Sequence, residues 1–299
     1  MTLHQLKLLC ALAKHRNLTR AGEELFLSQP AVTLQLKELQ KEVGAALYER
    51  LGKTLYLTDA GLALERYAQR ILALVEEATA AVQVLQKGDG GRIRVGASNT
   101  PGIYLLPPLL SAFRRDFPAV ELTVEVANTQ TIEEKIRRNE LDLGIVGGCI
   151  HCADLTMLPW MIDTLVLTVG MKHLWAKRRT VAPQELETQS LLGREQGSAT
   201  RETYENAFLQ HHFPLPRTAE MGGIEAIKRA VEAGLGVAML SAYSVAREVK
   251  EKRLATLSLK GLHVTRSLSV VHHKDKTLTP PMRAFLKRLH ESKRHGHIP

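Results

Sequence analysis

Residues 18–37 constrain this chain more than any other segment, because they predict two short helices joined by a turn. The turn falls near Phe26 and Leu27, and the second helix begins after Ser28. Ser28 can accept a hydrogen bond from a free amide of that helix's first turn, where Pro30 costs no helical bond. This is the layout of a helix-turn-helix motif, whose second helix can lie in a DNA major groove.

The second helix has two distinct faces. Its apolar residues recur at spacings of four, three and four, which predicts one inward face made of Val32, Leu36, Leu39 and Val43. We expect the rest of a three-helix core from Leu8, Leu9, Leu12, Ala13, Ala21 and Leu25. Gln29, Thr33 and Lys37 project outward, where polar side chains can reach base edges and lysine suits phosphate. An ordinary helical hairpin with a solvated face shows the same pattern, so that alternative stays open here.

The next residues predict a β-hairpin wing. Gly44 ends the helix, and residues 47–50 and 53–57 read as short strands joined by a turn at Leu51-Gly52. Thr58 then caps a long helix with an acidic first turn. The expected fold of residues 1–58 is therefore a winged helix-turn-helix. Its wing places three side chains beside backbone phosphates: Arg50, Lys53 and Thr54.

Residues 59–87 predict a long linker helix that also pairs two subunits. Apolar residues alternate at spacings of four and three, as in a coiled coil, at Leu64, Ala68, Ile71, Val75, Ala78, Val82 and Leu85. A core helix packed on its own domain is the alternative. We favour dimerisation, because a helix this long needs a partner for its stripe. Two paired copies would also bring two recognition helices to adjacent half-sites.

These motifs resemble the N-terminal domain of LysR-type transcriptional regulators, and the resemblance extends over essentially the full length. It is carried by Ser-Gln-Pro-Ala-Val-Thr at 28–33 and by residues 39–44, 47–50 and 57–61. Thr33 stands where serine is more usual, and Gly22 replaces one of a typical pair of alanines. The resemblance implies that helix 28–43 enters the major groove and the wing contacts the backbone. The candidate DNA-binding residues are Ser28, Gln29, Pro30, Thr33, Gln35, Lys37, Arg50, Lys53 and Thr54.

Composition sets wider bounds. A chain of 299 residues suits two or three domains. The net charge of +9 suits a nucleic-acid partner, yet residues 1–87 hold eleven Lys and Arg against only nine Asp and Glu. DNA binding is therefore predicted from the helix-turn-helix motif and not from the charge. Three cysteines argue against a disulfide scaffold and for a reducing compartment. Without a signal segment or a membrane-length apolar run, we expect a cytoplasmic protein with no membrane partner.

Residues 88–299 predict an α/β effector domain after a Gly-rich linker at 87–91. Strands are expected at 92–97, 121–126, 141–146, 164–169, 190–192, 236–240 and 268–271, and helices from 98 and at 132–139, 200–210, 224–233 and 280–290. This alternation favours parallel sheets covered by helices. The resemblance implies a two-lobe fold like that of periplasmic binding proteins, with lobe I at 92–163 and 267–299 and lobe II at 164–266. Strands near 164–169 and 267–271 would cross between them.

Three segments predict an effector site in the cleft between the lobes. Each lies where a helix begins after a strand, and helix N-termini attract anions. The candidate residues are Ser98, Asn99, Thr100, Asn128, Thr129, Gln196, Gly197, Ser198, Thr200 and Arg201. Each segment alone could simply be a helix cap. Residues 98–100 and 194–201 are also similar to the subgroup that controls carbon-fixation and sulfur-assimilation operons, which implies a small carboxylate, phosphate or sulfur oxyanion.

Cys149 and Cys152 form a CxxC pair around a histidine. Thiol redox sensing and half of a metal site are the functional interpretations. Two small residues in a loop are the alternative, and it is the one we favour, because no second ligand pair stands at metal spacing. We therefore expect no metal site and no cofactor.

Two other function classes compete with gene regulation. A solute-binding receptor would carry an export signal and no DNA-reading head, the reverse of this chain. An enzyme would show a phosphate loop, a serine elbow, HExxH or an acid/base pair, and none is present, so we expect no catalysis. The sequence thus predicts a transcription factor that binds double-stranded promoter DNA and responds to a small effector. The family resemblance implies a homodimer or homotetramer, with RNA polymerase as a candidate further partner.

Overall fold

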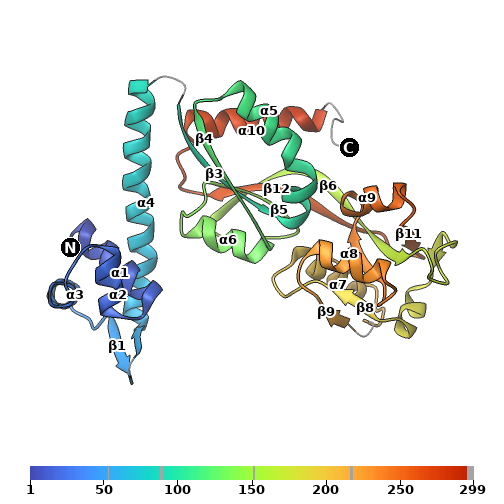
Figure 1. Ribbon diagram of the computed structural model, residues 1–299, viewed down its shortest axis with the longest axis horizontal. Coiled ribbons are helices and arrows are strands. Elements are labelled where there is room, and N and C mark those ends of the chain that lie inside the picture. The colour runs from blue at the N-terminus through green and yellow to red at the C-terminus, as the bar shows by residue number, and fades with distance from the viewer. Residues whose placement is uncertain (53, 88–89, 151, 216–217, 295–299) are drawn as a thin grey trace. The chain divides into compact units, whose positions relative to one another are not determined.

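The computed structural model describes residues 1–52, 54–87, 90–150, 152–215 and 218–294 (Figure 1). The chain forms two compact units, residues 1–87 and 88–299. In the described part of the chain, no helix is both long enough and apolar enough to cross a membrane.

The first unit is a winged helix-turn-helix followed by a long helix. Its elements are α1 (Leu3–His15), α2 (Leu18–Glu24), α3 (Gln29–Val43), β1 (Tyr48–Leu51), β2 (Thr54–Leu57) and α4 (Asp59–Lys87). Ser28 caps α3 by accepting a hydrogen bond from the amide of Ala31 at 3.4 Å. Gly44 ends α3 in the left-handed conformation (φ 75°), which glycine adopts without steric cost. The predicted helix-turn-helix and wing are confirmed.

The core of this unit follows the predicted apolar spacing, with one exception. Val32, Leu36 and Leu39 are fully buried, as are Leu8, Leu9 and Leu12 of α1. Val43 was expected in the same stripe but is 42% exposed. It is the last residue of α3, and the cluster that covers Leu39 consists of Leu9 and Leu47. The inward face of α3 therefore ends one turn early.

Gly61 fixes the start of α4 against the wing. The Thr58 hydroxyl accepts a hydrogen bond from the amide of Gly61 at 3.1 Å, which caps the helix as predicted. A Cβ at Gly61 would lie 1.9 Å from the carbonyl oxygen of Leu47, a distance no side chain can occupy. Only glycine allows α4 to begin this close to the residue that precedes β1.

The described part of the second unit contains a mixed eight-stranded sheet and a separate two-stranded parallel sheet, with helices packed around them. Its first half comprises β3 (Gly91–Ser98), the π-helix η1 (Pro101–Leu105), α5 (Leu106–Asp116), β4 (Val120–Ala127), α6 (Thr129–Arg137), β5 (Leu143–Gly147) and β6 (Leu155–Gly170). The second half comprises β7 (Thr180–Val181), the 3-10 helix η2 (Pro183–Thr188), β8 (Leu191–Gly193), α7 (Ala199–Gln210), β9 (Thr218–Glu220), α8 (Ile224–Glu232), β10 (Ala238–Ser241), α9 (Ala242–Lys250), β11 (Leu254–Leu259), β12 (Val264–His273) and α10 (Pro280–Arg294).

Two long strands join the lobes of this unit. The strand order is β4-β3-β5-β12-β6-β11-β7, with β10 also paired to β6. Lobe I holds β3, β4 and β5, which are mutually parallel; lobe II holds β7 to β11. Strand β6 runs from lobe I into lobe II and β12 runs back beside it, antiparallel. The predicted crossover strands are present, and both are longer than expected.

Parallel sheets were expected, but only part of the pairing is parallel: β3 with β4 and β5, β7 with β11, and β8 with β9. Strand β12 is antiparallel to both β5 and β6, and β10 and β11 are antiparallel to β6. The cause is the double crossover, because a strand that returns to its first lobe must run against the strand that left it. Elements β7, β9, α9 and β11 were not predicted.

Helices cover both faces of the lobe I sheet, with α5 and α10 on one side and α6 on the other (Figure 1). On the α6 side, Gly96 of β3 and Gly144 of β5 let the helix pack closely. A Cβ at either position would lie 2.5 Å from an apolar side chain, that of Leu141 or Ile136. The N-terminus of α6 begins at Thr129, directly after β4, and so lies at the carboxyl end of the parallel strands.

Candidate functional site

The outward face of α3 exposes the polar residues that the sequence indicated. Ser28, Gln29, Pro30 and Lys37 are exposed, and Thr33 and Gln35 are half-buried. The Thr33 hydroxyl donates to the backbone oxygen of Gln29 at 3.0 Å, and the Thr19 hydroxyl of α2 donates to the Gln29 side-chain oxygen at 3.5 Å. The first turn of α3 holds no acidic residue, so the positive end of the helix dipole is not offset. This surface suits a polyanion with hydrogen-bonding edges.

The wing tip carries a positioned cation. Arg50 is exposed, and its Nε donates to the carbonyl oxygen of Gly52 at 3.0 Å, which holds the side chain at the turn. Thr54 opens β2 and is half-buried, whereas Lys53 lies outside the described residues. Phe26 was not proposed as a contact residue from sequence, yet it is 97% exposed in the helix-helix turn, with φ 58°.

The predicted dimerisation stripe of α4 divides into a buried and an exposed part. Leu64 packs against Leu9, Leu39 and Leu47, and Ala68 is fully buried. These two positions therefore belong to the core of their own unit, because α4 packs along α1 here. Ile71 is half-buried, and the side chain of Leu85 lies outside the described residues. The exposed part of the stripe consists of Val75, Ala78 and Val82.

A buried arginine joins the two lobes at the centre of the second unit. Arg266 of β12 donates from Nη1 to Thr200 Oγ1 at 2.8 Å and from Nη2 to Thr100 Oγ1 at 3.0 Å. Its Nε and Nη2 also contact Asp163 Oδ2 at 2.9 and 2.8 Å, and Ser241 donates to Asp163 Oδ1 at 2.6 Å. One threonine follows β3 in lobe I, and the other lies in the first turn of α7 in lobe II. Arg266 and Asp163 stand on the two crossover strands themselves.

A second buried guanidinium faces the same space. Arg194 is 3% exposed and binds both carboxylate oxygens of Glu195, at 2.7 and 2.6 Å. Burial alone would raise the pKa of Glu195, but the bonds and charge of Arg194 outweigh it, and the net pKa is lowered. Burial lowers the pKa of Arg266; the charge of Asp163 opposes this, and the charge of Arg194 lowers the pKa further. The charge of Arg194 is therefore close enough to act on Arg266, and both residues border the same cavity.

Most of the predicted effector residues gather around one small cavity of about 10 Å³ beside these arginines. Its walls are Ser98, Asn99, Thr100, Asn128, Thr129, Ser198 and Thr200, together with Arg194, Ala199 and Arg266. Polar side chains from both lobes line it, and two guanidinium groups adjoin it, each paired with one carboxylate, that of Asp163 or Glu195. A site of this composition favours an anion with several acceptor oxygens.

The three polar residues at the end of β3, Ser98, Asn99 and Thr100, do not cap a helix, contrary to expectation. The Ser98 hydroxyl accepts from the amide of Gly147 at 3.3 Å, Asn99 donates to the carbonyl oxygen of Ala127 at 3.2 Å, and Thr100 accepts from Arg266. The helix that follows is a π-helix with no side-chain cap. Capping does hold for Asn128, whose side-chain oxygen accepts from the amide of Thr131 at 2.9 Å.

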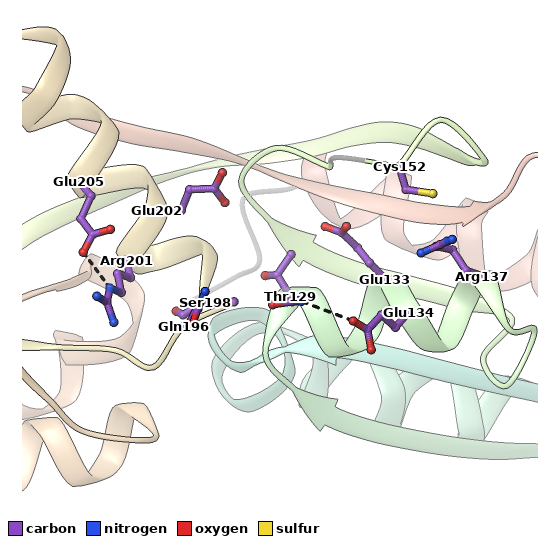
Figure 2. Close-up of a pocket in the computed structure, with 12 residues that line it drawn as sticks. Thr129, Glu133, Glu134, Arg137, Cys152, Gln196, Ser198, Arg201, Glu202 and Glu205 are labelled. Carbon is purple, nitrogen blue, oxygen red and sulfur yellow. Dashed lines mark hydrogen bonds and ion pairs between the residues drawn. The ribbon is translucent and has the colours of Figure 1, made fainter. Parts of the chain in front are cut away.

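The other predicted residues line a larger pocket outside this cavity. Gln196, Gly197 and Arg201 border a volume of about 670 Å³ between α6 and α7, shown in Figure 2. The charge of Arg201 is not directed at the inner cavity, because the guanidinium binds Glu205 at 2.8 Å and Glu220 at 2.7 Å. Acidic residues outnumber basic ones in this pocket, whose wall holds Glu133, Glu134, Glu202 and Glu205 as well as Arg137.

One backbone hydrogen bond and one from the side-chain amide of Asn128 close the cleft between cavity and pocket. The amide of Gln130 in lobe I donates to the carbonyl oxygen of Gly197 in lobe II at 3.2 Å, and Asn128 donates to that of Gln196 at 3.4 Å. Gly197 has φ 80°, and a Cβ there would lie 2.5 Å from the Gln130 side chain. A glycine is therefore required for this closed arrangement.

The CxxC motif lies at the edge of the outer pocket. Cys149 is exposed, and Cys152 is half-buried and contributes to the pocket wall (Figure 2); both are free thiols. The histidine between them, residue 151, lies outside the described residues. Within the described ranges, no group of three or more His, Cys, Asp or Glu side chains could hold a metal ion.

Comparison with known protein families shows which family the chain belongs to. Residues 3–62 match the model of the bacterial regulatory helix-turn-helix protein, lysR family, and residues 86–294 match that of the LysR substrate binding domain. The chain belongs to the LysR family of transcriptional regulators. Members of this family regulate transcription through a DNA-binding head and an effector-binding domain.

The LysR relatives point to the carbon-fixation subgroup. The chain is 33% identical over 288 residues to the transcriptional activator CmpR of Synechocystis, covering 96% of this chain and 94% of CmpR. It is 32% identical over 295 residues to the RuBisCO operon transcriptional regulator of Acidithiobacillus ferrooxidans, covering 99% and 95%. The resemblance inferred from sequence motifs is therefore confirmed.

Two solved structures of LysR regulators match as well. The regulatory domain of Synechocystis CcmR in complex with 2-PG is 28% identical with a TM-score of 0.64, over 68% of this chain and 98% of that domain. Full-length CbnR in complex with its target DNA is 25% identical with a TM-score of 0.68, over 98% of this chain and 100% of that chain. The predicted fold of a winged head, a long helix and a two-lobe α/β domain is confirmed.

Sequence reasoning missed the charged centre of this LysR cleft, although a signal was present. Arg266 has the same parity in its strand as the buried Val264 and Leu268, and Asp163 has the same parity as the buried Leu165. Side chains alternate between faces along a strand, so each charge falls on an inward face. Two inward charges of opposite sign, on the two strands expected to cross between the lobes, indicate a buried pair.

Proposed function

We propose that this LysR regulator binds promoter DNA sequence-specifically through α3 and the wing, and that a small oxyanion in the inner cavity modulates this binding or activation. The DNA-binding domain would comprise residues 1–58, the linker helix 59–87, and the effector domain 88–299, with lobe boundaries near 163 and 266. The proposed DNA contacts are Ser28, Gln29, Pro30, Thr33, Gln35, Lys37, Arg50, Lys53 and Thr54. The target DNA bound by CbnR supports this role.

One observation supports an anion as the effector. Two buried guanidinium groups, Arg194 and Arg266, face one cavity that also receives threonine hydroxyls from both lobes. The N-terminus of the twelve-residue helix α7 opens at the same cavity, at Ala199 and Thr200. Arginine and helix N-termini are the groups that bind carboxylates, phosphates and sulfates. The 2-PG complex of CcmR, a related regulator, supports the same class of ligand.

The effector must open the cleft before it can enter. A cavity of about 10 Å³ is the size of one water molecule, far smaller than a phosphorylated or carboxylated metabolite. Entry therefore requires the contact between Gln130 and Gly197 to break and the lobes to separate. Once inside, a ligand shifts the population toward the arrangement of the lobes that it binds best, in proportion to its differential affinity. We propose that this change in the arrangement of the lobes transmits effector binding to the rest of the protein.

Assembly follows from the exposed part of α4. Val75 and Val82 present apolar surface that a second copy would cover, which supports a homodimer, and the family resemblance favours a homotetramer. RNA polymerase is a further candidate partner, and we place the regulator in the cytoplasm with the DNA that it binds. We assign it no catalytic activity and no resident cofactor.

Calorimetry tests the effector site directly. The full-length protein is titrated with 2-phosphoglycolate and with sulfate, alongside Thr100→Ala and Ser198→Ala variants. We expect both substitutions to weaken binding, by about 1.5–3 kcal/mol for the loss of a hydrogen bond to a charged ligand. Thr123→Ala on the exposed strand β4 is the matched control and should bind like the wild type. Equal binding by all four proteins would remove Thr100 and Ser198 from the site.

A further inference from the structure

Hydrogen bonds join the two lobes on both sides of the inner cavity. On one side, α6 of lobe I meets α7 of lobe II at what we call the mouth. Gln130 donates there to Gly197, and Asn128 donates to Gln196. On the other side, η1 of lobe I meets α8 of lobe II through Tyr104. The helices of the two sides pack into separate core clusters, so the two sets of contacts lie on opposite faces of the domain.

The side opposite the mouth is held by what we call the tyrosine cluster: Tyr104, Glu225, Lys228 and Glu248. The Tyr104 hydroxyl donates to Glu225 Oε1 and accepts from Lys228 Nζ at 3.3 Å. Lys228 also binds Glu225 at 2.8 Å and Glu248 at 2.9 Å, and its Nζ lies 5.1 Å from the centre of the Tyr104 ring. The side chains of Lys228 and Glu248 are only 4% and 7% exposed. Burial, together with the bond and charge of Glu225, raises the pKa of Tyr104, so its hydroxyl stays protonated and keeps donating.

The mouth is held more weakly than the tyrosine cluster. Its two bonds join uncharged groups at 3.2 and 3.4 Å, and both Gln130 and Gln196 are exposed, so water can replace each bond as it breaks. A hydrogen bond to an ionised group is about twice as strong as one between neutral groups. The contact between the ammonium of Lys228 and the Tyr104 ring strengthens the cluster further. The lobes should therefore separate at the mouth.

The mouth also connects the inner cavity to the outer pocket. Thr129 and Ser198 border both spaces, and the outer pocket, of about 670 Å³, is large enough to admit a small metabolite. We propose that the cleft opens on one side only, at the mouth, while the tyrosine cluster stays joined and acts as the pivot. This inference rests on the oxyanion function proposed above, and it specifies that the effector enters through the outer pocket.

Hydrogen exchange measures opening of the mouth without any ligand. The amide of Gln130 lies in the first turn of α6, where amides have no partner within the helix, and it donates to the carbonyl oxygen of Gly197. Its exchange in the full-length protein, followed by mass spectrometry of peptides covering residues 129–137, therefore reports how often the mouth opens. Gly197→Ala is the positive control and should accelerate exchange, because its Cβ would lie 3.0 Å from that of Gln130.

Tyr104→Phe distinguishes opening on one side from opening on both, because it removes the hydroxyl and keeps the ring. We expect the Tm of the second unit to fall by about 3–6 °C for the loss of a bond to a charged group. Exchange at Gln130 and the calorimetric affinity for sulfate should both stay unchanged. Tyr204→Phe is the matched control, since Tyr204 has a buried hydroxyl with no partner in the described part of the chain. Its Tm should not fall.

If the tyrosine cluster instead parts whenever the mouth opens, weakening it makes opening easier. Tyr104→Phe would then speed exchange at Gln130 and tighten sulfate binding, each by about tenfold, and the pivot would be wrong. An unchanged Tm would also overturn the pivot, because the cluster would then hold nothing together. Unaltered exchange in Gly197→Ala would show that the cleft does not open at the mouth. If neither sulfate nor 2-phosphoglycolate binds the wild type, the proposed effector function fails, and exchange at Gln130 alone decides the pivot.

Discussion

Asp163→Asn is the substitution whose effect the structure predicts most sharply. Asp163 is completely buried, balances the charge of Arg266 at 2.8–2.9 Å, and accepts from Ser241 at 2.6 Å. Removing one partner of a buried ion pair leaves an uncompensated charge and costs about 3–5 kcal/mol. Asparagine keeps one acceptor oxygen, so we expect the lower end, about 3 kcal/mol. For a unit of this size, that corresponds to a fall in Tm of about 6–12 °C.

Differential scanning calorimetry of the full-length protein measures this change in the transition of the second unit. Glu125→Gln is the matched control, because Glu125 pairs with Lys135 at 2.6 Å on the surface of the same unit. That half-exposed pair should contribute only about 0–1 kcal/mol. Sulfate should stabilise Asp163→Asn more than the wild type, since an anion in the cavity would replace the lost carboxylate charge. A variant within about 1 kcal/mol of the wild type would refute the buried-pair argument.

Three other predictions concern DNA recognition, assembly and acid stability. Gln29→Ala should lower the preference for operator over scrambled DNA by about 1–3 kcal/mol, whereas Arg50→Ala should weaken binding to all sequences alike and reduce the salt slope by about one, both measured by fluorescence anisotropy. Val82→Glu should shift the sedimentation profile toward smaller species, and an unchanged profile would exclude the exposed part of α4 from the interface. Burial alone would raise the pKa of Asp142, but Arg94 and Lys276 outweigh it and the net pKa is lowered. A depressed carboxyl pKa stabilises the fold above its ordinary value of 3.8 and loses that contribution as pH falls, so Asp142→Asn should show a shallower decline of Tm in acid.

Local signals in the sequence were sufficient to predict the fold of the DNA-binding head. Ser28, Pro30 and Gly44 mark the two ends of α3 through capping and backbone conformation, which depend on near neighbours. The turn between β1 and β2 also depends only on residues that are close in sequence. Burial of Ala68 was harder to foresee, because a stripe with coiled-coil spacing packs equally well on its own domain or on a second subunit.

The effector domain depends on contacts that no local pattern contains. Arg266 and Asp163 are 103 residues apart, and they meet only because β12 returns antiparallel beside β6. The polar residues at 98–100 were correctly placed at the end of a strand, but their hydrogen bonds go to Gly147, Ala127 and Arg266 and not to a helix. Strand order and direction set these partners, and both are properties of the whole domain.

Genome-wide footprinting with the purified full-length protein, with and without 2-phosphoglycolate or sulfate, tests the central claim most directly. The account predicts a limited set of protected promoter sites whose occupancy or footprint length changes with the anion. In Thr100→Ala that response should need a higher anion concentration, while protection without the anion persists. Protection no greater than on scrambled DNA, or an anion response identical in wild type and Thr100→Ala, would contradict the account.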